Sequence, residues 1–217
     1  MKIRQCTKND LNQLTEIYID CAYNPKTNIL IRLGKIFIYY YHKICMENRN
    51  SIFIGAENEN GKIIGFVSGN LSSKNHLLNI QKNKYKLLIA SLPKIIFTPR
   101  LLFYLFKRYL SVKSRNNNFI SNEGARWEFW GVLDKYRKTK AGIKLHQSML
   151  AYCFLFGAKE LHLEVDSYLM AVAKFHQRSG GKVYKEITTE DGIRRFFIKY
   201  DNTILRKFYE KLIQFEN

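Results

Sequence analysis

The hydrophobic residues of the chain follow two kinds of spacing, and the switches between them mark the expected secondary structure. Apolar positions three or four residues apart are typical of helices, whereas alternation or a short continuous apolar run is typical of strands. The expected helices cover about 11–21, 29–46, 142–156, 170–179 and 202–215. The expected strands cover 2–6, a hairpin within 51–71, and the segments 126–133, 160–165, 182–187 and 194–200.

The hairpin within 51–71 has the clearest local signal. Two apolar runs flank a polar turn that contains Asn60 and Gly61, a dipeptide typical of tight hairpin turns. The order of elements is a strand, two helices, the hairpin, a helical insertion, then β-α-β-α and two strands. This order predicts an α/β protein, but not a doubly wound dinucleotide-binding fold, because the hairpin precedes the strongest strand-to-helix crossover. The junction that opens this crossover also lacks the glycine patterns of dinucleotide and P-loop sites.

The chain of 217 residues is strongly basic, with a formal net charge of +18. Such a charge favours an anionic partner: a phosphorylated ligand, a nucleic acid or an anionic membrane surface. A genome rich in lysine and asparagine codons is the alternative explanation.

The charge is most uneven within 60–122, where eleven Lys and Arg occur and no Asp or Glu. We expect residues 71–118 to form a basic helical insertion within a single domain of residues 1–217. Its sequence predicts two or more short amphipathic helices, interrupted at Pro93 and Pro99. Four interpretations stay open: a lid over a phosphorylated acceptor, helices lying in the plane of a membrane, a nucleic-acid surface, or an ordinary helical pair that covers the core.

The four cysteines are scattered, without C-x-x-C pairs or metal-ligand spacing, so we expect neither a disulfide framework nor a metal. The N-terminus lacks the apolar core of a secretory signal, and no uncharged apolar run reaches the roughly 18 residues of a membrane span. These features predict a cytoplasmic protein.

The segment most informative about chemistry joins the strand at 126–133 to the helix after it. A turn rich in Lys and Arg follows Asp134, and the helix is expected to begin near Gly142. The first N–H groups of a helix have no partners within it and lie at the positive end of the helix dipole. The junction therefore predicts a binding site for phosphate groups.

Three segments, in this order, resemble the GNAT superfamily of acyl-CoA-dependent N-acyltransferases. GKIIGFVSGNL is similar to the central hairpin strand of the family, and GAKELHLEVDSYLMAVAKFHQRSGGKVYKE to its second crossover. VLDKYRKTKAGIKL is similar to its CoA-binding segment, in which Arg137 and Gly142 fit the pattern and Lys140 replaces the first glycine. The resemblance covers most of the chain except about 71–118. It implies a mixed, mostly antiparallel twisted sheet flanked by helices, with the insertion between the hairpin and the CoA-binding strand.

The resemblance also implies acetyl-CoA as the acyl donor. The pyrophosphate would bind N–H groups of the turn, with positive charge from its lysines. The pantetheine arm would pair with backbone groups around 130–133 like an additional strand, and a bulge at Gly131 would open the space for it. The residues implied in cofactor binding are Val132, Leu133, Arg137, Lys138, Thr139, Lys140, Ala141 and Gly142.

Glu128 is the candidate general base, because the attacking amine must be neutral. Alternation along the strand predicts that its side chain shares a face with Arg126, Trp130 and Val132. A structural carboxylate, paired with Arg126 or with a lysine of the insertion, is the alternative interpretation.

His176 is the candidate acid for the departing thiolate. The family usually supplies a tyrosine from this helix, and His176 stands at the matching position, where its imidazolium form is a competent acid. Tyr168 and Tyr184 are alternative donors, and a purely structural histidine is the remaining interpretation.

The expected function is transfer of an acetyl or other short acyl group from acyl-CoA to the primary amine of a small acceptor, by direct attack in a ternary complex. Related proteins with such insertions resemble enzymes of sugars and cell-surface polysaccharides, which favours an amino sugar, free or nucleotide-linked. The alternative is a non-catalytic protein that binds CoA or an anionic surface. No specific nucleic acid is expected, peripheral contact with an anionic membrane stays open, and the oligomeric state is not specified by the sequence.

Overall fold

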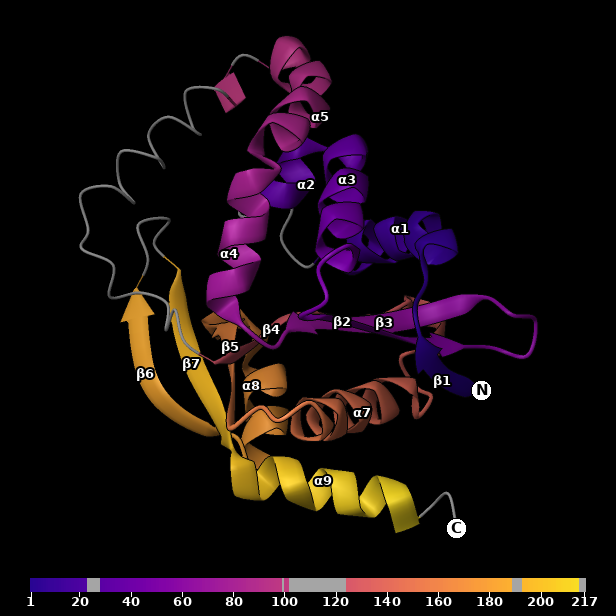
Figure 1. Ribbon diagram of the computed structural model, residues 1–217, viewed down its shortest axis with the longest axis vertical. Helices are drawn as coiled ribbons and strands as arrows, with labels where there is room; N and C mark the ends of the chain where they lie inside the picture. Colours follow the sequence, from indigo (N-terminus) through magenta and orange to yellow (C-terminus); the bar gives the residue numbers. More distant parts are fainter. Residues whose placement is uncertain (23–27, 99, 102–123, 189–192, 215–217) are drawn as a thin grey trace.

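A seven-stranded sheet forms the centre of the protein (Figure 1), with the strand order β1-β2-β3-β4-β5-β7-β6. The computed structural model describes residues 1–22, 28–98, 100–101, 124–188 and 193–214. Neighbouring strands pair antiparallel, except for β4 with β5. The expected mixed, mostly antiparallel sheet is confirmed. The strands are β1 (Lys2–Gln5), β2 (Ser51–Glu57), β3 (Ile63–Asn70), β4 (Ala125–Val132), β5 (Glu160–Asp166), β6 (Lys182–Thr188) and β7 (Arg194–Asp201).

Helices cover both faces of this sheet (Figure 1). They are α1 (Leu11–Cys21), α2 (Ile29–Leu33), α3 (Lys35–Met46), α4 (Ser73–Lys82), α5 (Lys84–Phe97), α7 (Ala141–Leu155), α8 (Met170–Arg178) and α9 (Asn202–Gln214). Alternate residues of β2 and β3 face the two layers. Phe53 and Phe66 pack with α1 and α3, whereas Ile54 and Val67 pack with α7 on the opposite face.

The helix expected over 29–46 is two helices, α2 and α3, because the chain bends at Gly34. Gly34 has a φ of 92°, in the left-handed region that glycine adopts without a steric penalty. Its N–H donates to the carbonyls of Leu30 and Ile31 and so closes α2. The prediction of one continuous helix is therefore wrong.

Two helices of the expected insertion are present, α4 and α5, but Pro93 does not interrupt them. It lies inside α5 and leaves the carbonyl of Ile89 without its usual N–H donor. Both residues are exposed, so water can satisfy that carbonyl. The second expected interruption, Pro99, lies outside the described residues. None of the described helices is long and apolar enough to cross a membrane.

β4 and β5 separate soon after they begin. Their parallel pairing joins Ala125 with Leu161 and Arg126 with His162. Beyond these pairs, no described strand pairs with this edge of β4. The sheet therefore opens between its two central strands, and each presents backbone groups along an edge that is normally covered.

A bulge interrupts β4 at Glu128. On β3, Ser68 pairs with Phe129 and Gly69 with Trp127, so Glu128 has no opposite residue. The bulge expected at Gly131 is therefore wrong, since that residue is regularly paired with β3. Gly131 instead allows close packing, because a Cβ there would lie 2.9 Å from the Cβ of Cys21 at the end of α1.

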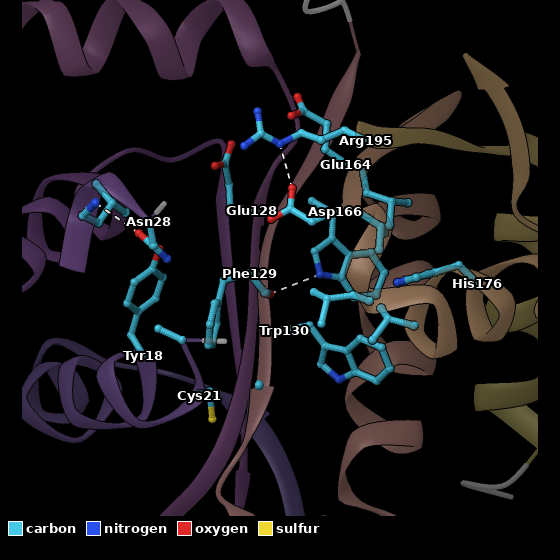
Figure 2. A pocket seen from close by; sticks show the side chains of 18 of the residues that line it. Tyr18, Cys21, Asn28, Glu128, Phe129, Trp130, Glu164, Asp166, His176 and Arg195 are labelled. Carbon is cyan, nitrogen blue, oxygen red and sulfur yellow. Dashed lines mark hydrogen bonds and ion pairs between the residues drawn. The ribbon is translucent and has the colours of Figure 1, made fainter. Parts of the chain in front are cut away.

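The bulge also changes which side chains share a face of β4. Trp130 and Val132 pack with the core under α7, and Figure 2 shows Phe129 and Trp130 on opposite sides of the strand. Glu128 contacts Asn70 and Arg126 instead. The predicted common face of Glu128, Trp130 and Val132 is wrong, because side-chain alternation holds only within an uninterrupted strand.

Candidate functional site

A cavity of ≈ 720 Å³ lies where β4 and β5 diverge (Figure 2). The end of α1, the start of α2, α8 and the turn after β4 complete its walls. Its volume falls within the range of roughly 300–1,000 Å³ that is typical of small-molecule sites. No residue of α4 or α5 lines it, so the described part of the insertion does not form a lid in direct contact with this space.

The structure brings many of the predicted site residues to this cavity. Its lining includes Glu128, Val132, Arg137, Gly142 and His176. Leu133 and the turn residues 138–141 are not among the lining residues, although they lie in the same connection between β4 and α7.

The edge of β4 offers backbone groups to the cavity. The N–H of Leu133 donates to the carbonyl of Ile64 on β3 at 3.0 Å. Backbone groups of successive strand residues point to opposite sides, so those of Val132 and Trp130 point toward the open edge. An extended ligand can therefore pair with β4 as an additional strand would.

In the turn between β4 and α7, some backbone N–H groups donate hydrogen bonds within the protein and others do not. A short 3₁₀ helix covers Asp134–Tyr136. The N–H groups of Arg137, Thr139 and Ala141 donate to Asp134, Tyr136 and the Thr139 hydroxyl, respectively. Those of Lys138, Lys140 and Gly142 have no backbone partner among the described residues. Three of the six predicted N–H groups thus remain available for an anion, at the start of a 15-residue helix.

Lys140 occupies the position where the resembled family has glycine, and the local backbone accepts its side chain. Its φ is −76° and its ψ is 4°, outside the left-handed region. No described residue other than glycine has a positive φ. The substitution therefore introduces no backbone strain, and it adds a positive charge beside the open N–H groups.

Glu128 lines the cavity, within a small network of charges. Its Oε1 accepts a hydrogen bond from Nδ2 of Asn70 at 2.9 Å and lies 3.8 Å from Nε of Arg126. The closer carboxylate to Arg126 is Glu164, at 2.7 Å from Nη2. Asn70 is fully buried, so it fixes one carboxylate oxygen of Glu128, while the side chain stays 25% exposed at the cavity.

His176 is buried within a histidine–tyrosine–histidine chain. Its Nδ1 lies 2.8 Å from the hydroxyl of Tyr200, and Nε2 of His146 lies 3.0 Å from the same oxygen. Trp127 and Trp130 pack around both imidazoles. The sequence did not indicate this arrangement, because Tyr200 lies on β7, far from both histidines along the chain.

Burial sets the charge of these two histidines. It lowers the pKa of His176 to about 4. It also lowers the pKa of His146 to about 3, and the neighbouring His176 adds to that effect. Both rings are therefore neutral at neutral pH. This favours a hydrogen-bonding role for His176 over the imidazolium acid that the sequence suggested.

Two polar residues of the cavity wall were missed by the sequence analysis. The hydroxyl of Tyr18 lies 3.2 Å from Nδ2 of Asn28, and the side-chain oxygen of Asn28 caps α2 by accepting from Leu30 and Ile31. Burial raises the pKa of Tyr18 to about 12, so it is a neutral hydrogen-bonding group. Asn28 before an apolar helix was a readable cap signal, but nothing local to Tyr18 indicated the cavity.

A further set of hydrogen-bonded polar side chains lies at the end of β5. Oδ1 of Asp166 lies 2.7 Å from Nε of Arg195, and its Oδ2 accepts from the Tyr168 hydroxyl at 2.7 Å. All three line the cavity. Tyr184, the other tyrosine considered, packs against His162 and is not among the lining residues. A polar residue directly after the apolar strand was the readable signal for Asp166.

Solved structures with a similar fold are known. An N-acetyltransferase from Staphylococcus aureus Mu50 is 16% identical, with a TM-score of 0.61 over 93% of this chain and 98% of that one. Ribosomal-protein-alanine N-acetyltransferase from Brucella melitensis is 15% identical, with 0.59 over 93% and 99%. Naa20 from Chaetomium thermophilum, solved with a bisubstrate analogue, is 15% identical, with 0.54 over 95% and 90%. No protein-family profile matches the chain, and no curated protein does.

These similarities span nearly the whole of both chains in each pair. The mixed, mostly antiparallel seven-stranded sheet with helices on both faces agrees with them. The chain has the fold of the GNAT acetyltransferases.

Proposed function

We propose that this protein is an N-acyltransferase that moves an acetyl or other short acyl group from acyl-CoA to the primary amine of a small acceptor. The observation that carries the proposal is the open edge of β4, which borders the cavity and continues into a turn with free N–H groups. This geometry suits a long ligand that has an amide-containing arm at one end and phosphates at the other.

In this proposal, backbone groups of Val132 and Trp130 bind the amide arm of CoA, and the turn at 138–142 binds its pyrophosphate. An N–H of the β4 edge polarises the thioester carbonyl and stabilises the negative charge that develops on its oxygen. Glu128 takes a proton from the amine, whose nitrogen then attacks the carbonyl carbon. The C–N bond forms, the C–S bond breaks, and the thiolate leaves as CoA.

Neutral His176 assists the leaving thiolate through a hydrogen bond. The Tyr200 hydroxyl has two acceptors within reach, Nδ1 of His176 at 2.8 Å and the backbone carbonyl of His176 at 3.2 Å. In this proposal its one proton goes to the nearer Nδ1, so the remaining ring proton of His176 is on Nε2, which is then a donor toward the cavity that the ring lines. His146 then donates to Tyr200 from its own Nε2. Tyr200 is in this view a positioning residue that sets the tautomer of His176.

The acceptor side of the cavity presents two arginines and three carboxylates, which are Arg126, Arg195, Glu128, Glu164 and Asp166. Carboxylates bind sugar hydroxyls and amines, and arginine forks bind phosphate. We therefore infer an amino sugar, free or nucleotide-linked, as the first acceptor class to test. A peptide N-terminus is the second, since one structural neighbour is by name an acetyltransferase of ribosomal-protein alanine.

Acetyl-CoA is expected to raise the melting temperature of the protein. A ligand at about 100 times its Kd stabilises the native state by about 2.7 kcal/mol, or roughly 5–10 °C for a chain of this size. Differential scanning fluorimetry measures the shift. The double variant Lys138→Ala/Lys140→Ala should reduce it, while the exposed pair Lys207→Ala/Lys211→Ala on α9 serves as the matched control. The absence of a shift at millimolar acetyl-CoA would refute CoA binding and with it the proposed reaction.

His176→Phe and Tyr200→Phe are expected to lower kcat by about tenfold or more with the acetyl-CoA shift retained. Both changes keep the aromatic volume and remove one member of the hydrogen-bonded chain. Release of free CoA thiol, followed with an acceptor panel, measures kcat. Full turnover in His176→Phe would assign the proton or hydrogen bond to another group, and Tyr168→Phe would then be the variant to measure.

A further inference from the structure

One face of α5 is a stripe of exposed apolar side chains. They recur at helical spacing and are between 42% and 68% exposed. The stripe consists of Tyr85, Leu88, Ile89, Leu92 and Ile96. Exposed apolar residues are common singly, but five on one face of a 14-residue helix are not.

The exposed stripe is not the face by which α5 packs on the rest of the protein. The opposite face already packs into the protein, where Leu87 and Ile95 contact the cluster of Leu33 and Phe37 from α2 and α3. Ala90 is buried on the same inner face. An ordinary surface helix is polar on the side away from its core, whereas α5 is apolar on both sides.

The charged residues of α4 and α5 all have one sign. At 100° per residue, Lys84 and Lys86 fall on either side of it, and Lys74 and Lys82 extend the basic character along α4. The Lys84 ammonium lies 5.2 Å from the centre of the Tyr85 ring, so its stem follows the stripe. In the sequence, no Asp or Glu occurs within 60–122.

We propose that the stripe docks α5 in the plane of an anionic lipid surface. An apolar face that enters the acyl boundary, with lysines at its margins that reach lipid phosphates, is the arrangement that binds such surfaces. A second copy of the chain fits less well, because a symmetric contact would bring the lysines of both stripes together without a carboxylate. A nucleic acid would leave the aliphatic side chains without an apolar partner. The proposal does not depend on the acyltransfer reaction.

Co-sedimentation with vesicles tests this surface on the full chain. We expect binding to vesicles of 70% phosphatidylcholine and 30% phosphatidylserine to be at least about tenfold tighter than to pure phosphatidylcholine, since each lysine near the surface contributes about 1 kcal/mol. Leu88→Gln/Ile89→Gln should lose this binding by a similar factor. The matched control is Leu155→Gln/Phe156→Gln, which alters two equally exposed apolar residues at the end of α7.

Three results would overturn the proposal. The first is no binding of the unaltered protein to anionic vesicles. The second is equal binding by the stripe variant, provided that its melting temperature matches that of the control variant. The third is a dimer in sedimentation velocity that the stripe variant dissociates, which would assign the face to a second copy of the chain. A folded stripe variant that alone loses vesicle binding would support it.

Discussion

Glu128→Gln is expected to lower kcat by about 100-fold or more, because general base catalysis contributes about 10²–10⁴ in rate. Glutamine has the shape of glutamate, and its side-chain oxygen can still accept the hydrogen bond from Asn70. An amide cannot, however, accept a proton from the amine. Acetyl-CoA affinity should not change, since the groups proposed to bind the cofactor lie on the backbone of β4 and in the turn.

Initial rates of thiol release from pH 6 to 9 measure this effect. Glu164→Gln is the matched control, because Glu164 lines the same cavity and pairs with the same Arg126. Equal losses in both variants would indicate that the charge balance around Arg126 matters rather than a base. An unchanged profile in Glu128→Gln would remove Glu128 from the reaction.

The protein is expected to lose about 4–6 kcal/mol of unfolding free energy between pH 7 and pH 5. Three buried histidines with strongly lowered pKa values cause most of the loss, and burial also lowers the pKa values of His76 and His162. Burial lowers the pKa of His42 to about 4, of His146 to about 3 and of His176 to about 4, whereas a histidine in the unfolded chain has a pKa near 6.5. The unfolded chain therefore binds more protons below pH 6.5, and stability falls as the pH drops from there toward 4. The loss is large against a typical total of about 5–15 kcal/mol.

Urea unfolding at pH 7 and pH 5 measures the difference. His42→Phe should reduce it by about 2 kcal/mol, the share of one histidine. Phenylalanine suits this position, because Nδ1 of His42 has no hydrogen-bond partner among the described residues and the ring packs edge-on against Phe53 and Phe66. The buried carboxylate of Asp10 does not interfere, since Arg4 lowers its pKa to about 2. Equal stability at the two pH values would show that these histidines are accessible to protons in the folded protein.

The sequence predicted the strands and most helices because their periodicity is local. The hairpin of β2 and β3, the crossover from β4 through α7 and the final strand pair all follow from apolar spacing and turn residues. Gly34 was passed over because one glycine inside an apolar helical pattern does not reveal the sign of its φ. Pro93 was wrongly predicted to interrupt a helix, since an exposed proline can remain inside a helix where water reaches the unpaired carbonyl.

The cavity was harder to predict, because its parts meet only in three dimensions. A bulge needs one unpaired residue, and the run around Glu128 has no spacing that distinguishes it from a regular strand. His176 was found by its place in the resembled motif, but its environment was not, because Tyr200 and His146 come from other elements. The helix after β4 begins at Ala141, within one residue of the predicted start, since a helix start is a local feature.

The bulge gives residue 128 an unusual independence within β4. Every other residue from Arg126 to Val132 has a partner on β3, so a change there disturbs a cross-strand pair. Glu128 has no such pair, and its side chain lines the cavity. A substitution at this position can therefore leave the register of the sheet intact, and its cost to folding comes instead from the buried Asn70 amide, which loses the carboxylate that accepts its hydrogen bond.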